Sequence, residues 1–533
     1  MSVKESSSFF TKTTAGVISV FFVLLYLLTH LIALVKLPVF SDEAIYIRWA
    51  QLIMDEPLRY LFFPLNDGKT PLFIWLLVPF QYIFSDQLYA GRFLSVLVGL
   101  GQLAATDGLV RRLGGRGSAR IAAALSITLL PYWYFHHRMA LMDGMLTFWL
   151  TLTVLFLIRS YQEISSHKKQ TAPVVFTQQL LLSIMLSVGA FGAALWSKLP
   201  ALLVVPSFAV LLGITPLGGK KICLQKIVTA AAVFFGGIAC FLLLRISPAF
   251  GQLFSRGSDF LFPLQAVLFE GRWRETLPST PNYIYYFIAY LSLPSVVLPP
   301  LALLCKNRHY RAILSLLLAA GVFLFPIMLL GKVVYPRYLL PAALFITPAA
   351  ALAFEALVEK MNTIHSRFNW AQLTVGITIL LFTMTSTQFL LANWFNPDAL
   401  PFVSADQEQY LTKWSSGHGI AEVTQSIKIT AKSGKIAVAT EGSFGTLPDG
   451  ILLYLHRTQV TNIWVEGIGQ PVVQIPESFK TRVAGYDQIW LVVNADRMKL
   501  ELPKEKLKTQ YCRPYAAACL QVWDITEYVR MNH

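Results

Sequence analysis

Long apolar runs separated by short polar segments occupy roughly the first three quarters of the chain. A helix needs about 20 mostly apolar residues to cross a bilayer, and about eleven segments approach that length. They begin near Ala15, Leu88, Ala119, Leu141, Phe176, Leu199, Ile227, Ile284, Ala312, Tyr338 and Ala371. The pattern predicts an α-helical multi-pass membrane protein of about 11 transmembrane helices.

Basic residues gather in loops that alternate along the chain, and such loops usually face the cytoplasm. They include Lys4, Lys12, Arg111, Arg112, Arg116, Arg120, Arg159, Lys168, Lys169, Lys220, Lys221, Lys226, Lys306, Arg308, Arg311, Lys360 and Arg367. All can face the cytoplasm only if the run of about 14 apolar residues from Pro71 to Phe84 does not cross the membrane. We expect that run to be juxtamembrane or re-entrant, within a large first outer loop (residues 37–87).

The pattern changes after about Asn393, where short β-rich runs alternate with helical ones. Strands are predicted at 435–440, 460–465, 488–493 and 520–525, and helices at 444–456 and 477–483. The chain therefore divides into a membrane part, 1–393, and a soluble α/β domain, 394–533, which an odd number of spans places outside the cytoplasm. In that domain Cys512 and Cys519 can form a disulfide or remain as two free thiols.

Composition supports the membrane assignment, since 55% of residues are hydrophobic and only 14% are charged, against about 25% charged in soluble proteins. The net charge of +15 could suggest a nucleic-acid partner. Because the basic residues lie in short loops between apolar runs, topology explains them and we expect no nucleic acid. The expected location is the plasma or inner membrane, with the N-terminus in the cytoplasm.

Two adjacent acids, Asp42 and Glu43, follow the first apolar run. Ionisable residues close to the bilayer are costly and usually functional. A structural explanation is also open: Ser41 could cap a helix whose first turn holds both acids, which the helix dipole favours. The two explanations are compatible, because a helix terminus can also hold a catalytic base rigidly.

Several cations are expected on the same outer face, where the positive-inside rule predicts few. They are Lys69, Arg138, Lys198, Lys332 and Arg337. A structural explanation is open here too. Long basic side chains at the headgroup boundary can simply extend their charged ends into water, and Arg138 could form a structural ion pair with Asp143. Chemically, cations suit the phosphate of a lipid-linked sugar, and a carboxylate can take a proton from the attacking hydroxyl.

Five short motifs on this face resemble those of the GT-C superfamily of polyprenyl-phosphate-sugar-dependent glycosyltransferases. The nearest branch is similar to the protein O-mannosyltransferase and lipid A aminoarabinose-transferase group. The motifs are Asp42-Glu43, Lys69-Thr70-Pro71-Leu72, Arg138 to Asp143, Trp196-Ser197-Lys198-Leu199-Pro200 and, more loosely, Arg337-Tyr338-x-x-Pro341. The resemblance covers the membrane part and leaves the C-terminal domain without an assigned role.

The resemblance implies an inverting enzyme that moves one sugar from a polyprenyl phosphate to a protein, lipid or glycan acceptor. It makes Asp42 the catalytic base, and Glu43 a residue that orients the acceptor or assists. The residues expected to bind the donor phosphate are Lys69, Arg138, Lys198 and Arg337, with Asp143 positioning Arg138 and Tyr338 in support. It also implies no cofactor and no divalent metal.

Two other classes of protein remain open. A transporter or flippase for a lipid-linked or small polar substrate usually shows internal repeats and charges at mid-membrane. Here the charges gather at one end of the predicted spans, which favours an enzyme. An inactive scaffold is the third possibility, and the intact acidic pair argues against it.

Overall fold

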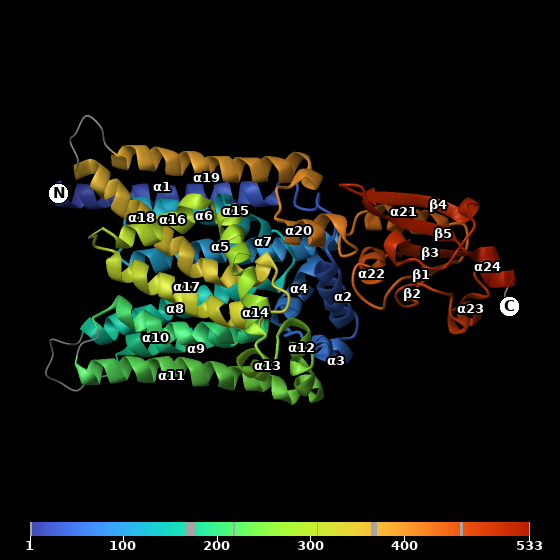
Figure 1. The fold of residues 1–533 in the computed structure, drawn as a ribbon, viewed down its shortest axis with the longest axis horizontal. Coiled ribbons are helices and arrows are strands. Elements are labelled where there is room, and N and C mark those ends of the chain that lie inside the picture. The colour runs from blue at the N-terminus through green and yellow to red at the C-terminus, as the bar shows by residue number, and fades with distance from the viewer. Residues whose placement is uncertain are drawn as a thin grey trace.

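The computed structural model describes residues 3–166, 177–216, 219–305, 307–363, 370–458 and 462–531. A bundle of long helices carries a smaller sheet domain at one end (Figure 1). Parts of the predicted strand at 460–465 lie outside the described residues, as do Lys168, Lys169, Lys306 and Arg367.

Seven helices of the described chain are long and apolar enough to cross a membrane. They are α5 (Gln87–Arg112), α8 (Met142–Ser166), α9 (Gln178–Ser197), α11 (Lys220–Leu242), α17 (Tyr310–Leu330), α18 (Leu340–Thr363) and α19 (Trp370–Phe395). Shorter apolar helices correspond to the expected spans near Ala15, Ala119 and Leu199. They are the apolar part of α1 (Val3–Leu31), α6 (Gly117–Leu129), and a broken run of η3 (Leu199–Val204), α10 (Val205–Val210) and η4 (Leu211–Ile214). The multi-pass membrane architecture is confirmed.

The span expected from Ile284 is not straight. It consists of α15 (Thr280–Leu291) and α16 (Leu293–Leu303), and the stretch Trp273–Leu291, which ends with α15, meets α16 at a bend of 109°. At the break Ser292 adopts a φ of 67°, which a right-handed helix cannot use. Pro294 then lacks the backbone N–H that would continue the hydrogen-bond ladder. Local backbone chemistry, which hydropathy does not register, therefore breaks this segment.

The short apolar run in the first large loop forms α4 (Leu72–Ile83). Its 12 residues fall short of a full crossing. It packs against α2 (Ser41–Asp55) and α5 and lies beside α2 at the sheet-domain end of the bundle (Figure 1). The length agrees with the expectation that this run does not cross the membrane fully, and its juxtamembrane or re-entrant position stays a prediction.

Short elements complete this region of the chain. They are α3 (Pro57–Tyr60), η1 (Phe63–Asp67), α7 (Pro131–His136), η5 (Leu243–Ile246), η6 (Pro248–Phe254), α12 (Gly257–Phe260), α13 (Leu264–Phe269), α14 (Trp273–Thr276), η7 (Leu277–Ser279), η8 (Pro336–Leu339), η9 (Pro397–Ala399), α20 (Ser404–Gln407) and the π-helical turn η10 (Glu408–Thr412).

The sheet domain holds a five-stranded sheet in the order β2-β1-β3-β5-β4. Strand β1 pairs in parallel with β2 and β3, whereas β5 pairs antiparallel with β3 and β4. The strands are β1 (Ile436–Thr440), β2 (Ile463–Gly467), β3 (Gln488–Asn494), β4 (Leu507–Arg513) and β5 (Ala517–Asp524). The helices are α21 (Ile420–Thr430), α22 (Asp449–Leu455), α23 (Glu477–Val483) and α24 (Thr526–Met531), with short turns η11 (Ala495–Arg497) and η12 (Lys504–Lys506).

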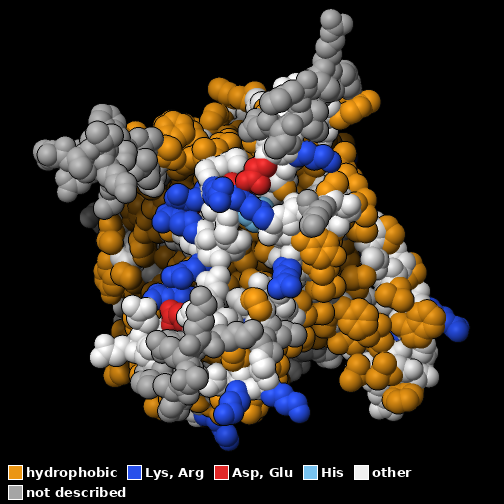
Figure 2. All heavy atoms as spheres, turned by 90° about the vertical axis from the view of Figure 1, so that its left-hand side faces the viewer, with side chains coloured by type: hydrophobic (Ala, Val, Ile, Leu, Met, Phe, Trp, Pro, Cys, Tyr) orange, Lys and Arg blue, Asp and Glu red, His pale blue; other side chains and the backbone are white. Residues whose placement is uncertain are grey.

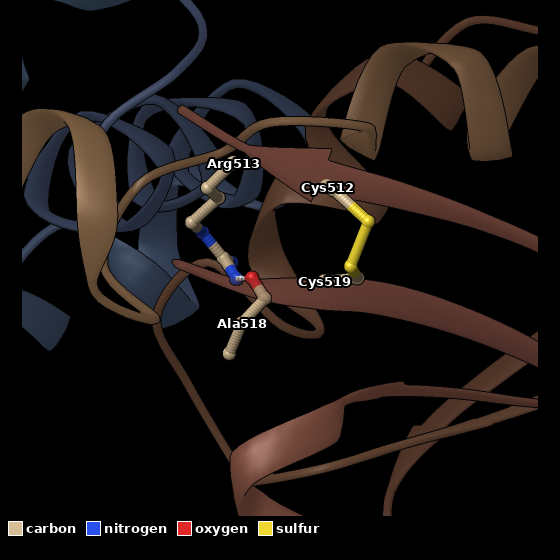
Figure 3. The surroundings of a disulfide bond; sticks show 4 residues. All are labelled: Cys512, Arg513, Ala518 and Cys519. Carbon is tan, nitrogen blue, oxygen red and sulfur yellow. Dashed lines mark hydrogen bonds between the residues drawn. A yellow bond between two sulfur atoms is a disulfide. The ribbon is translucent and has the colours of Figure 1, made fainter. Parts of the chain in front are cut away.

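The predicted α/β character of this domain is confirmed, and β4 is the strand that the pattern missed. A disulfide between Cys512 and Cys519 joins β4 to β5, which settles the question left open by the sequence (Figure 3). Beside it, Arg513 donates a hydrogen bond to the Ala518 carbonyl at 2.6 Å. The predicted helix at 444–456 begins only at Asp449, because Gly445, with a φ of 111°, lies in a turn.

Lysine and arginine side chains gather on the end of the bundle that lies farthest from the sheet domain (Figure 2). Helix α5 runs from the domain end toward this basic end, where Arg111 and Arg112 close its last turn. The basic residues at the end of α5 thus lie at the end of the bundle away from the sheet domain, as the alternation of basic loops requires.

Residues 112 and 332 are therefore expected on opposite sides of the membrane. Both side chains are exposed, Arg112 at the end of α5 and Lys332 just after α17. In a Cys305→Ser background, Lys332→Cys should react with a membrane-impermeant maleimide in intact cells, whereas Arg112→Cys should react only after permeabilisation. Labelling of both residues in intact cells would refute this arrangement.

Candidate active site

The start of α2 is held by backbone contacts from the segment that leads into the sheet domain. The Ser41 N–H donates to the Ser415 carbonyl at 2.9 Å, and Phe40 forms an isolated antiparallel bridge with Ser416. The N-cap is Phe40 rather than Ser41, and the Phe40 N–H is satisfied by the Glu43 carboxylate at 3.0 Å. The first turn of α2 therefore carries both acids, as the helix-cap explanation proposed.

Glu43 faces the protein interior. Its carboxylate is fully buried and receives the Arg92 guanidinium at 2.9 and 2.7 Å, together with the Ala140 N–H at 2.7 Å. With the Phe40 N–H, each oxygen accepts two hydrogen bonds, so the acceptor capacity of the carboxylate is filled. The expected contact with an acceptor is not supported by this geometry, which makes Glu43 a residue that positions α2.

Arg92 is the residue that the motif analysis missed. It lies within α5 and is 1% exposed, and it also donates to the carbonyls of Leu34, Leu37 and Pro38. The pair thus joins α5 to the chain between α1 and α2. A lone arginine inside an apolar run was the available signal, since such residues are rare without a partner.

Asp42, next in the chain, points the other way. Its side chain is 24% exposed, and its Oδ2 lies 2.9 Å from Nη2 of Arg337. Burial alone would raise the pKa of Asp42, but Arg337, Lys69 and Lys198 outweigh it and hold the pKa below its ordinary value. Asp42 is therefore a carboxylate at neutral pH, in the form that can accept a proton.

Arg337 has hydrogen-bond donors to spare. Its side chain is 7% exposed, and its Nε and Nη1 have no protein hydrogen-bond partner in the described chain. The guanidinium carbon lies 5.0 Å from the ring centre of Phe40, 5.7 Å from that of Tyr335 and 5.4 Å from that of Tyr338. Buried donors normally have partners, so this guanidinium is suited to receive an anion.

Lys198 and Lys69 complete the positive cluster around Asp42. Lys198 follows α9, pairs with Asp143 at 2.6 Å and lies 4.7 Å from the ring centre of Tyr338. Lys69, half-buried, follows η1, and both lysines act electrostatically on Asp42. Four separate parts of the chain thus bring together an acid and three cations, with Tyr338 in contact with two of them.

Arg138 lies apart from this cluster. It is 3% exposed and donates to the carbonyls of Thr29, His30 and Ala33, at the C-terminal end of α1. The expected phosphate-binding role is therefore not supported, and the suggested pairing of Arg138 with Asp143 is wrong, because Asp143 holds Lys198 instead. Carbonyls at a helix C-terminus attract a cation, which explains the placement.

Among the described residues no group of three or more His, Cys, Asp or Glu side chains is placed to hold a metal ion. The positive charge of the described cluster comes from Lys69, Lys198 and Arg337.

Residues 66–247 match the family model of the dolichyl-phosphate-mannose-protein mannosyltransferases. This stretch includes Lys69, Asp143 and Lys198. No curated protein matches the chain at a significant level by sequence.

Solved structures resemble the whole chain. ArnT from Cupriavidus metallidurans in the apo state is 14% identical, with a TM-score of 0.58 over 96% of this chain and 99% of that one. The structure of the same protein bound to undecaprenyl phosphate is 13% identical in sequence, with a TM-score of 0.55 over 94% of this chain and 97% of that one. A third structure is that of the oligosaccharyltransferase AglB from Archaeoglobus fulgidus, in complex with an inhibitory peptide and a dolichol-phosphate. It is 13% identical in sequence, with a TM-score of 0.53 over 91% of this chain and 70% of that one.

The chain has the GT-C fold. Together with the family match inside the membrane part, this confirms the interpretation of the chain as a membrane glycosyltransferase. The similarity reaches the sheet domain as well, because nearly the full length of both chains is covered.

Loss of the Glu43 charge should destabilise the fold. In Glu43→Gln the buried Arg92 guanidinium loses its counter-charge, and the free energy of unfolding should fall by about 3 kcal/mol. Thermal unfolding in detergent measures the change. Glu56→Gln, an exposed site just past the other end of α2, is the matched control and should melt like the parent. Equal melting of both variants would remove Glu43 from the support of α2.

Proposed function

We propose that this glycosyltransferase moves a single sugar from a polyprenyl-phosphate donor to a hydroxyl group of a protein, lipid or glycan acceptor. The observation that carries the proposal is the pairing of Asp42 with Arg337, whose Nε and Nη1 have no hydrogen-bond partner among the described residues. A proton acceptor and a receptor for an anion thus lie side by side, and the reaction requires both.

Arg337, Lys69 and Lys198 would bind the donor phosphate. Arginine can grip two phosphate oxygens through its planar fork, while lysine contributes a mobile point charge. Undecaprenyl phosphate and dolichol-phosphate are bound in the structures of ArnT and AglB, which supports a donor of this chemical class. Asp143, through its contact with Lys198 at 2.6 Å, would hold that ammonium in place.

The chemical step would be one inverting displacement. The acceptor oxygen attacks the anomeric carbon, and its proton passes to the Asp42 carboxylate. As the new C–O bond forms, the bond from the anomeric carbon to the phosphate oxygen breaks, and its electron pair remains on the polyprenyl phosphate. The three cations stabilise the charge that develops on this leaving group.

The donor would also tune the base. In the structure described here, Arg337 and both lysines depress the pKa of Asp42, which makes the carboxylate a weak base. A donor phosphate would take part of the same positive charge through the unpartnered nitrogens of Arg337. The pKa of Asp42 would then rise toward its ordinary value, so the base would gain strength when the donor is bound.

We further propose that the N-terminus lies in the cytoplasm and that this site faces the outside of the cell membrane. The basic end of the bundle supports this orientation, because positively charged loops favour the cytoplasmic side (Figure 2). The sheet domain would then lie outside, where a disulfide such as Cys512–Cys519 is stable.

Asp42→Asn should lower the transfer rate by about 100-fold or more, because the amide cannot accept the proton. Thermal unfolding should change less than in Glu43→Gln, since Asp42 is partly exposed and the support of α2 comes from Glu43. Release of polyprenyl phosphate from labelled donor measures the rate, with Glu56→Gln as the active control. Near-normal turnover in Asp42→Asn would exclude the carboxylate as the base.

Arg337→Met should weaken binding of undecaprenyl phosphate about tenfold or more, because charge-assisted hydrogen bonds to a buried site are lost. The affinity can be measured by the ligand-dependent rise in melting temperature. Lys332→Met removes an exposed cation a few residues away and should bind like the parent. Equal affinity in both variants would place the phosphate elsewhere.

A further inference from the structure

The segment that follows the last membrane helix reaches back to the catalytic face. After α19 the chain forms η9, α20 and the π-helical turn η10. The Tyr410 ring lies 4.7 Å from that of Phe40 and 4.9 Å from that of Phe135. This segment therefore packs against the residue that begins α2 and against α7.

Three of its side chains are buried with polar atoms that have no protein partner in the described chain. They are Oδ1 of Asp406, both amide atoms of Gln409 and the hydroxyl of Tyr410. Their residues are 1%, 6% and 2% exposed. An unpaired buried polar group is costly, and most such groups have partners. Four such atoms within five residues, next to a π-helical turn of a kind often found at functional sites, indicate a site for a polar ligand.

Asp406 is held in a fixed position. The Tyr290 hydroxyl donates to its Oδ2 at 2.8 Å and accepts the Val403 N–H at 3.1 Å. One carboxyl oxygen is thus committed, and the other is left for a ligand. Burial raises the pKa of Asp406 to about 7, so near neutral pH this group can either donate or accept a hydrogen bond.

Tyr410 and the guanidinium proposed to hold the donor phosphate share Phe40 as a neighbour, because the Phe40 ring centre lies 4.7 Å from that of Tyr410 and 5.0 Å from the guanidinium carbon of Arg337. Arg337 acts electrostatically on Asp406 and on Tyr410, and Tyr410 also senses Asp42 and Asp143. In the donor the anomeric carbon is bonded directly to the phosphate oxygen. The sugar ring must therefore lie next to whatever binds that phosphate, which for Arg337 is the neighbourhood of Phe40 and Tyr410.

We infer that Asp406, Gln409 and Tyr410 bind the hydroxyl groups of the transferred sugar and set the sugar preference of the enzyme. The inference rests on the proposed function. A carboxyl, a carboxamide and a phenol offer donors and acceptors at fixed positions, which can distinguish sugars that differ in the direction of one hydroxyl. A site built to hydrogen-bond a substrate hydroxyl discriminates strongly, because a mismatch leaves its buried groups unpaired.

The experiment uses the full-length enzyme in detergent or liposomes and polyprenyl-phosphate mannose, glucose and galactose as donors. The variants are Asp406→Asn, Gln409→Leu and Tyr410→Phe, which keep approximate size, and Glu408→Gln is the exposed control on the same turn. At least one of the three should lower kcat/KM for the preferred donor about tenfold or more and change the ratio between donors. Affinity for undecaprenyl phosphate, which has no sugar, and melting temperature should stay as in the parent.

Unchanged donor ratios in all three variants would overturn the inference. So would a change confined to the KM of the acceptor, or a loss of affinity for undecaprenyl phosphate, since these would assign the cluster to the acceptor or to the phosphate. A lowered melting temperature with unchanged ratios would show a structural role and also overturn it. If the parent enzyme transfers sugar and Asp42→Asn does not, the proposed function stands whichever way these variants behave.

Discussion

The buried pair between Glu43 and Arg92 is the constraint on which the site depends. It fixes the first turn of α2 against α5 and the backbone of Ala140, at a position where both side chains are buried. Successive side chains on a helix point in directions about 100° apart. With Glu43 committed to the interior, Asp42 must therefore face the cations on the other side of α2.

That geometry separates the work of two neighbouring acids. One is saturated by donors and holds the scaffold, while the other remains partly exposed beside a guanidinium with donors to spare. In the second pair, Asp42 binds Arg337. Under the proposed function a donor phosphate would compete with Asp42 for the same guanidinium. The positive charge around Asp42 comes from Arg337, Lys69 and Lys198.

The sheet domain takes part in building this face. In its leading segment the Ser415 carbonyl accepts a hydrogen bond from the Ser41 N–H at the start of α2, and the Tyr410 ring packs against Phe40, which also contacts Arg337. Contacts between α2 and α22, and the hydrogen bond from Gln51 to the Leu453 carbonyl at 3.1 Å, extend the junction. The domain thus helps to position α2 from outside the bundle, and the buried pair does so from within.

Hydropathy and the residue pattern alone determined the multi-pass bundle, the short length of α4 and the α/β character of the C-terminal domain, because those properties are local sums over a segment. Motif order identified Asp42, Lys69, Lys198 and Arg337. Tertiary structure decided what a pattern cannot register: that Asp143 pairs with Lys198, that Arg138 holds the end of α1, that Glu43 faces inward, and that residues 406–410 return to the site. Each of these depends on which segments meet in space. Whether a charged side chain supports the fold or faces the candidate site follows from its burial and partners rather than from its residue type.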